Sequence, residues 1–242
     1  MKCIILAAGY ATRLYPLTEN FPKPLLDVKG KNILDWIIDD ISENIEEFVV
    51  ISNHKFIEHF NKWAAEKTQK ITVIDDGTIS NETRLGAVRD IEFAIEKLNI
   101  SDDSLVIAGD NLLDFSLNRF IEYSISKGTS CIMRYYEPSY EKMKKCAELV
   151  LDGDRIIEMN EKPEFPKSNW CSPAFYYLLK TDLARVGEAI ADGAKTDAPG
   201  SFIAWLSSKT EVNAYEMPGK RYDIGNLESY EKIKKEYNGY VK

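Results

Sequence analysis

The sequence contains few of the features that mark secreted, membrane-spanning or nucleic-acid-binding proteins. Its four cysteines lie far apart and form no CxxC pair, which disfavours a disulfide framework or a zinc site. No apolar run is long enough to span a bilayer, and the apolar stretch at the N-terminus is too short for a signal peptide. A net charge of −8 leaves no broad basic face. We therefore expect a cytoplasmic protein that binds neither nucleic acid nor membrane.

Apolar strands and amphipathic helices alternate along the first half of the chain. Uninterrupted apolar residues predict buried strands at 1–8, 47–52, 70–75 and 104–110. Apolar residues at three- and four-residue spacing predict helices between them, at 31–42, 56–67 and 86–98. This alternation is typical of a mostly parallel sheet with helices on both faces and ligands at the carboxyl ends of its strands.

The second half changes to strands joined by short turns. Strands are expected at 129–136, 147–152, 155–160 and 171–179, and helices at 181–193 and 227–237. The turn at Asp152-Gly153-Asp154 predicts an antiparallel hairpin. Because no linker-like boundary interrupts the chain, we expect one α/β domain over 1–242. Its Rossmann-like, mostly parallel sheet would carry an added antiparallel lobe.

The stretch LAAGYATRLYPLT (6–18) follows the first expected strand and has the composition of an anion-binding loop. Its small residues, including Ala8 and Gly9, let backbone N–H groups approach a ligand closely. Arg13 and Lys23, the latter between two prolines, supply positive charge. This combination favours a phosphorylated ligand, whereas the absence of GxGxxG from the loop disfavours a dehydrogenase of the Rossmann type.

This loop and the PKPLL that follows it resemble the opening motif of the sugar-phosphate nucleotidyltransferases, or sugar-nucleotide pyrophosphorylases. The usual form is LAAGxGTRLxPLT followed by PKP, and Ala11 stands where the motif has its second glycine. The resemblance, which is nearest to the glucose-1-phosphate thymidylyltransferases, covers almost the whole chain. It implies the nucleotide-diphospho-sugar transferase fold, with an NTP-binding half (1–128) and an acceptor-binding half that ends in a closing helix (129–242).

The resemblance also assigns roles to residues. It implies that Arg13 and Lys23 are catalytic, and that Mg²⁺ binds Asp110 in AGDN and Asp223 in RYDIG. The base-reading loop of the family, often GTAGA or GLAQA, corresponds to the region of Arg84-Leu85-Gly86, so the identity of the base stays open. The nucleotide-binding residues implied are Leu6, Ala8, Gly9, Arg13, Arg84 and Gly86.

The acceptor half carries the family's EKP motif and several departures. By resemblance, Glu161 contacts the acceptor's hydroxyls, Lys162 binds its phosphate, and Asn169 completes the acceptor-binding set. Ala147 and Ala174 stand where thymidylyltransferases for glucose 1-phosphate carry glycines, in CAELVLD and NWCSPAFYY against YGVVEFD and NxxxTGxYF. We therefore expect an acceptor other than ordinary α-glucose 1-phosphate, or one held differently.

The expected function is Mg²⁺-dependent transfer of a nucleotidyl group from an NTP (dTTP or UTP, or CTP) to a sugar 1-phosphate, with release of pyrophosphate. Two alternatives stay open: a cytidylyltransferase for a non-sugar phosphate or phosphonate, and a non-catalytic nucleotide-sugar sensor on the same fold. A glycosyltransferase is disfavoured because Asp110 is followed by Asn111 and Leu112 rather than by a DxD motif. The partners implied are an NTP and a phosphorylated small-molecule acceptor, and a homo-oligomer stays open.

Overall fold

The computed structural model describes residues 1–241, which form two compact units, each assembled from separate segments of the chain. Unit 1 consists of Met1–Arg84, Ala108–Arg119 and Pro218–Lys242, and unit 2 of Leu85–Ile107 and Phe120–Met217. The NTP-binding and acceptor-binding halves expected from the sequence are functional assignments and stay a prediction.

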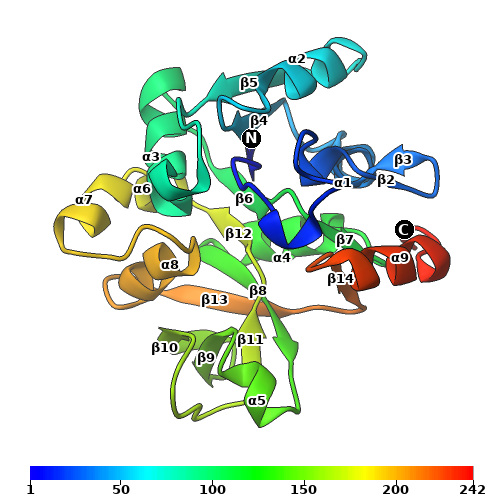
Figure 1. The fold of residues 1–242 in the computed structure, drawn as a ribbon. Coiled ribbons are helices and arrows are strands. Elements are labelled where there is room, and N and C mark those ends of the chain that lie inside the picture. The colour runs from blue at the N-terminus through cyan, green and yellow to red at the C-terminus, as the bar shows by residue number, and fades with distance from the viewer. Residues whose placement is uncertain (242) are drawn as a thin grey trace. The chain divides into compact units, whose positions relative to one another are not determined.

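Unit 1 is built on a short parallel ladder. Its main strands are β1 (Lys2–Leu6), β4 (Glu47–Ser52) and β5 (Ile71–Asp75), and each pairs with the next in parallel. Every residue of β4 is buried, because this strand lies between the other two. Figure 1 shows α2 (Ile57–Ala65) beside β4 and β5, against which it packs. The continuous apolar runs of the sequence are therefore explained by strands covered on both faces.

The remaining elements of unit 1 are short. They are η1 (Thr12–Leu14), η2 (Lys23–Leu25), β2 (Asp27–Val28), β3 (Lys31–Asn32), α1 (Ile33–Ile41), η3 (Asn81–Thr83), β7 (Asn111–Leu113), β14 (Arg221–Asp223) and α9 (Leu227–Glu236). The expected helices at 31–42, 56–67 and 227–237 correspond to α1, α2 and α9 within a few residues at each end.

Unit 2 is a mixed sheet with short covering helices. Its strands are β6 (Ser104–Ala108), β8 (Ser130–Tyr136), β9 (Ala147–Asp152), β10 (Arg155–Glu161), β11 (Trp170–Ser172), β12 (Phe175–Leu178) and β13 (Val212–Glu216). They lie in the order β11-β9-β10-β13-β8-β12-β6. The helices are α3 (Ala87–Leu98), α4 (Asn118–Lys127), α5 (Tyr140–Met143), α6 (Lys180–Leu183), α7 (Val186–Ala191) and α8 (Gly200–Ser207). The chain passes between the units four times: after Arg84, within β6, within α4 and after Met217.

The expected antiparallel hairpin is confirmed. Strands β9 and β10 pair antiparallel around Gly153, whose φ of +60° suits glycine in a tight turn. Strands β8 and β13 run parallel, and the other strand pairs described within unit 2 are antiparallel. No helix within residues 1–241 combines the length and apolar character that crossing a bilayer requires.

The sequence predicts one strand and one helix as continuous elements, but each is divided into two in the structure. The strand at 171–179 divides into β11 and β12, because Pro173 has no N–H for a ladder and its carbonyl accepts the Phe175 N–H at 2.8 Å. The helix at 181–193 divides into α6 and α7, since the backbone leaves the helical region at Arg185 (φ −91°, ψ 5°). Helices α4 and α8 and strand β13 were not expected from the sequence.

A buried carboxylate in unit 1 makes stability depend on pH. Glu47 is 7% exposed; burial raises its pKa, but hydrogen bonds from Lys2, Thr72 and Lys70 outweigh this and lower it to about 2. The depressed pKa means that this stabilisation is complete above about pH 4.5 and disappears as the pH falls toward 2.

We expect Glu47→Gln to lower the free energy of unfolding by about 3 kcal/mol at pH 7. Near pH 2 the variant and the wild-type chain should differ far less, because the wild-type carboxyl group is then about half protonated in the folded state and almost fully protonated in the unfolded state. Urea unfolding at both pH values measures the two differences. An equal difference at pH 7 and pH 2 would show that the charge of Glu47 is not the cause.

Candidate active site

The expected acceptor motif lies in the segment that joins β10 to β11 in unit 2. Glu161 is the last residue of β10 and is half-buried, and Lys162 is exposed. Lys162 has a φ of +51°, a left-handed conformation that residues other than glycine seldom adopt. Its N–H donates to the Cys146 carbonyl at 2.9 Å, which fixes this conformation. Backbone strain of this kind concentrates at functional sites.

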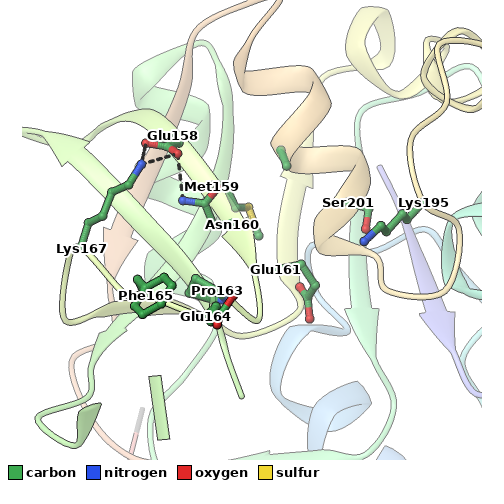
Figure 2. Close-up of a pocket in the computed structure, with 11 residues that line it drawn as sticks. Glu158, Met159, Asn160, Glu161, Pro163, Glu164, Phe165, Lys167, Lys195 and Ser201 are labelled. Carbon is green, nitrogen blue, oxygen red and sulfur yellow. Dashed lines mark hydrogen bonds and ion pairs between the residues drawn. The ribbon is translucent and has the colours of Figure 1, made fainter. Parts of the chain in front are cut away.

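A cavity of about 550 Å³ opens beside this segment (Figure 2). Lys167, Glu158 and Asn160 lie on one side of the view, joined by ionic and hydrogen bonds, and Lys195 and Ser201 lie on the other. The lining residues are Glu158, Met159, Asn160, Glu161, Pro163, Glu164, Phe165, Lys167, Lys195, Ser201 and Ala204. This size and its mixture of charged and polar groups suit a small polar molecule.

The three expected acceptor-binding residues differ in their surroundings. Burial raises the pKa of Glu161, and Asp197 adds to the rise while Lys162 opposes it. Asn169 makes two hydrogen bonds within the protein: its Nδ2 donates to the Glu137 backbone carbonyl, and its backbone carbonyl accepts the Glu137 N–H, each at 2.8 Å. Glu161 thus lines the cavity, whereas Asn169 holds the loop through two hydrogen bonds.

In unit 1, the expected phosphate-binding loop leaves the end of β1. Asn53 is fully buried, and its Nδ2 donates to the Ala8 carbonyl at 2.9 Å, which fixes the start of the loop. Gly9 is exposed, and a Cβ added to it would meet no atom within 4 Å. Neither crowding nor a positive φ within the protein requires glycine at this position. The missing side chain leaves the backbone at Gly9 open to close approach by a ligand.

Ala11 occupies the position where the family motif has glycine, and its backbone explains that preference. It is left-handed (φ 47°, ψ 41°), and its carbonyl accepts a 2.8 Å hydrogen bond from the buried Thr18 hydroxyl. The following turn, η1, places Arg13 on the surface and buries Leu14. This part of the family motif therefore forms a turn that exposes Arg13 next to the loop.

We expect Ala11→Gly to stabilise the chain by up to about 1 kcal/mol, because glycine adopts the left-handed conformation without steric cost. Thermal and urea unfolding of the two proteins measure this difference. Destabilisation by Ala11→Gly would show that the left-handed turn costs little and that the alanine side chain contributes packing.

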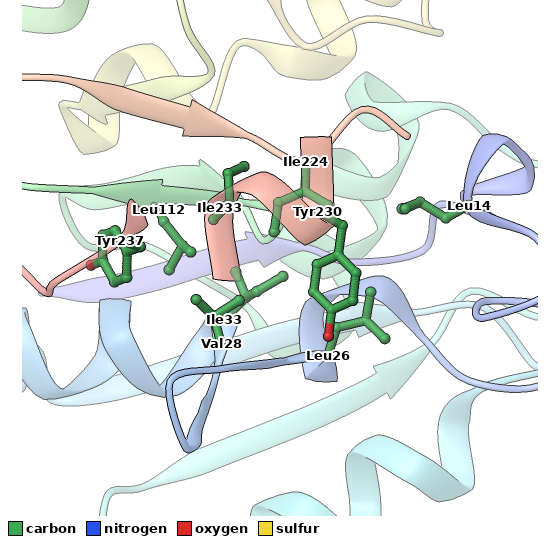
Figure 3. Close-up of a cluster of buried hydrophobic side chains, with 9 residues drawn as sticks. All are labelled: Leu14, Leu26, Val28, Ile33, Leu112, Ile224, Tyr230, Ile233 and Tyr237. Carbon is green, nitrogen blue, oxygen red and sulfur yellow. The ribbon is translucent and has the colours of Figure 1, made fainter. Parts of the chain in front are cut away.

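A core cluster in unit 1 links the loop to the C-terminal helix (Figure 3). Its buried members are Leu14, Leu26, Val28, Ile33, Leu112, Ile224, Tyr230, Ile233 and Tyr237. Two tyrosines are also fixed by hydrogen bonds, Tyr230 to the Asp27 carbonyl at 2.8 Å and Tyr237 to the Leu113 carbonyl at 2.9 Å. The cluster holds β7 and β14 in place; Asp110 directly precedes β7, and Asp223 is the last residue of β14.

Lys23 and Asp110, 87 positions apart in the sequence, form an ion pair. Lys23 Nζ lies 2.8 Å from Asp110 Oδ2, and Asn111 Nδ2 donates to the other carboxylate oxygen at 2.7 Å. The Lys23 side chain is 10% exposed and that of Asp110 39% exposed. The lysine is therefore held in place by the protein, while the carboxylate is partly open to solvent.

Asp223 lies on the strand that pairs with β7. The antiparallel register of β14 and β7 places Asp223 opposite Asn111, the residue after Asp110. Arg221 donates to Asn111 Oδ1 at 2.6 Å and lies 3.9 Å from Asp223 Oδ1. Within residues 1–241, no group of three or more His, Cys, Asp or Glu side chains could hold a metal by itself. The two aspartates are thus brought to neighbouring backbone positions.

The remaining nucleotide-binding candidates, Arg84 and Gly86, have clear structural roles. Arg84 is exposed and donates to the Asn81 carbonyl at 3.0 Å. Gly86 precedes α3 with φ +93°, and a Cβ there would lie only 2.5 Å from the Thr196 carbonyl oxygen. The Ala87 N–H donates to the Asp197 carbonyl and the Val88 N–H donates to the Thr196 carbonyl. The packing of α3 alone therefore requires glycine at position 86.

Several residues near these sites were missed by the sequence reasoning. Lys195 and Ser201 line the cavity, but they lie in a loop and at the start of α8, where no motif singles them out. Asn111 and Arg221 bridge Asp110 and Asp223, and their roles depend on the pairing of strands more than a hundred residues apart. Only the AGDN and RYDIG motifs give a signal for that pair.

Comparisons with known proteins show what this chain is similar to. A family model described as nucleotidyl transferase matches residues 2–239. The Sulfolobus acidocaldarius protein named "Putative mannose-1-phosphate guanyltransferase" is 31% identical over 238 residues, which are 96% of this chain and 62% of that protein. "Bifunctional protein GlmU" of Methanococcus aeolicus is 33% identical over 234 residues, 93% of this chain and 51% of that protein. The chain thus spans about half to three-fifths of the length of these relatives.

A solved structure named "Putative Glucose-1-Phosphate Thymidylyltransferase", from Bacillus anthracis, has a TM-score of 0.80 to this chain. The match covers 98% of this chain and 96% of the other at 20% identity. At this level of identity the likeness shows a shared fold.

Proposed function

Because the chain belongs to the nucleotidyl transferase family, we propose that it transfers a nucleotidyl group from an NTP to a sugar 1-phosphate and releases pyrophosphate. The family and the nucleotide-diphospho-sugar transferase fold expected from the motifs are confirmed. The observation that carries the proposed activity is the Lys23–Asp110 pair; the residue before Asp110, Gly109, donates its N–H to the carbonyl of Leu6, where the Gly9 loop begins. A fixed cation next to a partly exposed carboxylate suits a triphosphate bound with a metal ion.

The proposed reaction needs no protein nucleophile. A phosphate oxygen of the acceptor, already ionised at neutral pH, attacks the α-phosphorus of the NTP, forming the new P–O bond while pyrophosphate leaves. The work of the protein is then to position two anions and to stabilise the growing charge. Lys23 would contact the triphosphate and the attacking phosphate, Arg13 the leaving pyrophosphate, and Lys162 the acceptor phosphate.

The donor chemistry of Asp110 and Asp223 fits Mg²⁺. This ion is commonly held by one or two carboxylates, with the rest of its coordination supplied by water and substrate phosphates. Both side chains are partly exposed, at 39% and 55%, so substrate oxygens could complete the set. When bound, Mg²⁺ would neutralise phosphate charge and polarise the α-phosphate.

We further propose that the acceptor differs from ordinary α-glucose 1-phosphate. Ala147 adds a methyl group where the family motif has glycine, next to Gly200, the residue before the cavity-lining Ser201. A Cβ on Gly200 would lie 3.7 Å from Ala147 Cβ and 3.2 Å from Glu161 Oε2, so the backbone at Gly200 is closely packed against both side chains. A clear kinetic preference for glucose 1-phosphate over a panel of sugar phosphates would contradict this.

The experiment measures pyrophosphate release with Mg²⁺ for ATP, GTP, CTP, UTP and dTTP, each paired with sugar 1-phosphates and with small phosphates and phosphonates. We expect release that requires both an NTP and a sugar 1-phosphate. Release only with a non-sugar phosphate or phosphonate would identify the alternative cytidylyltransferase-type activity. No release from any pair, in a protein that still binds NTP, would favour the sensor.

A further inference from the structure

Glu148 is a buried carboxylate that the proposed mechanism does not use. It lies in β9, between β10 and β11, paired with Asn160 on one side and Cys171 on the other, and it is 0% exposed. Isolated charge in such a place is unfavourable unless hydrogen bonds compensate for the lost water. The partners of this carboxylate therefore indicate why it is retained.

The hydrogen-bond partners of Glu148 come from the loop between β10 and β11 and from Asn160, near the end of β10. Oε1 accepts the backbone N–H groups of Lys167 and Ser168, the second at 2.7 Å, and Oε2 accepts Asn160 Nδ2 at 3.1 Å. Both oxygens are thus occupied by N–H donors of the protein. A side chain that is fully buried, with a protein donor on each oxygen, is not available to contact an acceptor molecule.

These contacts fasten the returning end of the loop that carries the acceptor motif. Ser168 adds a hydrogen bond from its hydroxyl to the Leu149 carbonyl at 2.5 Å. At the leading end, the Lys162 N–H is held by the Cys146 carbonyl. Residues 146–149 therefore hold both ends of the loop, while its middle, with Phe165 72% exposed, lines the cavity.

A second set of bonds joins the same loop to β10 near the surface. Asn160 Nδ2 also donates to Glu158 Oε1 at 3.0 Å, and Lys167 Nζ contacts both Glu158 oxygens at 2.8 and 2.9 Å (Figure 2). Asn160 thus connects the buried and the surface carboxylates. The surface ion pair is solvated and contributes little by itself, so the buried Glu148 carries most of the restraint.

We propose that Glu148 is a positioning residue of the acceptor site, which fixes the loop from Lys162 to Asn169 without touching the acceptor. The expected change in KM for the acceptor rests on the proposed function, whereas the expected change in loop mobility does not depend on catalysis. Removing the charge should loosen the loop and weaken acceptor binding while leaving NTP binding in unit 1 unchanged.

The test compares the wild-type chain with Glu148→Gln, which keeps the size of the side chain but retains only one acceptor oxygen. Hydrogen–deuterium exchange of the peptide covering 162–169 should accelerate by about tenfold or more, as expected when a charge-assisted hydrogen bond is lost. With the NTP and acceptor identified by pyrophosphate release, KM for the acceptor should rise by about tenfold and KM for the NTP should change less than about twofold.

Glu47→Gln is the matched control, since it also removes a buried carboxylate but lies in β4 of unit 1. It should lower stability without accelerating exchange in 162–169 or raising KM for the acceptor. If Glu148→Gln does not fold, Asn160→Ala removes the Nδ2 donor to Glu148 Oε2 and should accelerate exchange in 162–169 by a smaller factor.

Unchanged exchange in 162–169 for Glu148→Gln, or for Asn160→Ala in its place, would overturn the proposal. An equal rise in KM for both substrates would also contradict it. Faster exchange in a protein that releases no pyrophosphate from any substrate pair would contradict the proposed function and leave the role of Glu148 in the loop standing.

Discussion

Replacing Lys23 by methionine is expected to lower kcat by a factor on the order of 10² or more. The methionine keeps most of the side-chain volume but removes the cation that lies 2.8 Å from Asp110 and, in the proposed mechanism, contacts the phosphates. Because that interaction strengthens as charge develops in the transition state, kcat should fall more than KM for the NTP rises. Pyrophosphate release under saturating substrates measures the loss.

The control for this variant is Lys232→Met on α9, which removes a lysine that is 68% exposed. It should leave both kcat and the unfolding temperature nearly unchanged. The fold of Lys23→Met should also persist, because Asp110 is 39% exposed and keeps its hydrogen bond from Asn111. A folded Lys23→Met protein with near-normal kcat would refute the catalytic role of Lys23.

Gly86→Ala is expected to destabilise the protein by about 3 kcal/mol or more. Two effects add at this position: a left-handed φ of +93°, and a Cβ that would approach the Thr196 carbonyl oxygen to 2.5 Å. Because that oxygen belongs to backbone that accepts the Val88 N–H, the start of α3 must shift to relieve the contact. Urea unfolding at pH 7 gives the free-energy difference.

Gly193→Ala separates the two effects. Gly193 has a similar φ of +89°, but a Cβ there would meet no atom within 4 Å. This variant should therefore cost only the backbone term of about 1 kcal/mol. Similar losses for Gly86→Ala and Gly193→Ala would show that the Thr196 contact relaxes freely. A Gly86→Ala protein of normal stability that no longer binds NTP would assign Gly86 to the nucleotide instead.

Much of the fold could be predicted because local pattern and final burial agree. The apolar run EFVVIS forms β4 at the residues expected, since a central strand buried on both faces has no reason to alternate. The Asp152-Gly153-Asp154 turn gives its hairpin because a left-handed glycine suits it. By contrast, the break between α6 and α7 leaves no proline or other strong local signal, and α8 lacks the polar face that makes a helix visible in a sequence.

The candidate site was predictable only where motifs carry it. Ala11 is an example. The sequence shows that this motif position usually holds glycine, but only the structure shows the reason, which is a left-handed backbone at Ala11. Lys195 and Glu148 give no such signal, because their places depend on loops and on the pairing of β9 with two other strands. Asn169 was expected to bind the acceptor, and its hydrogen bonds to Glu137 show a structural use that the motif does not reveal.

Following the α- and γ-phosphorus of the NTP separately tests the central claim most directly. With the substrate pair identified by pyrophosphate release, the reaction is run once with NTP labelled at the α-phosphorus and once with NTP labelled at the γ-phosphorus. Nucleotidyl transfer predicts that the α label appears in the nucleotide-linked acceptor and the γ label in pyrophosphate. Appearance of the γ label in the acceptor, or of the α label in free nucleoside monophosphate alone, would contradict the account.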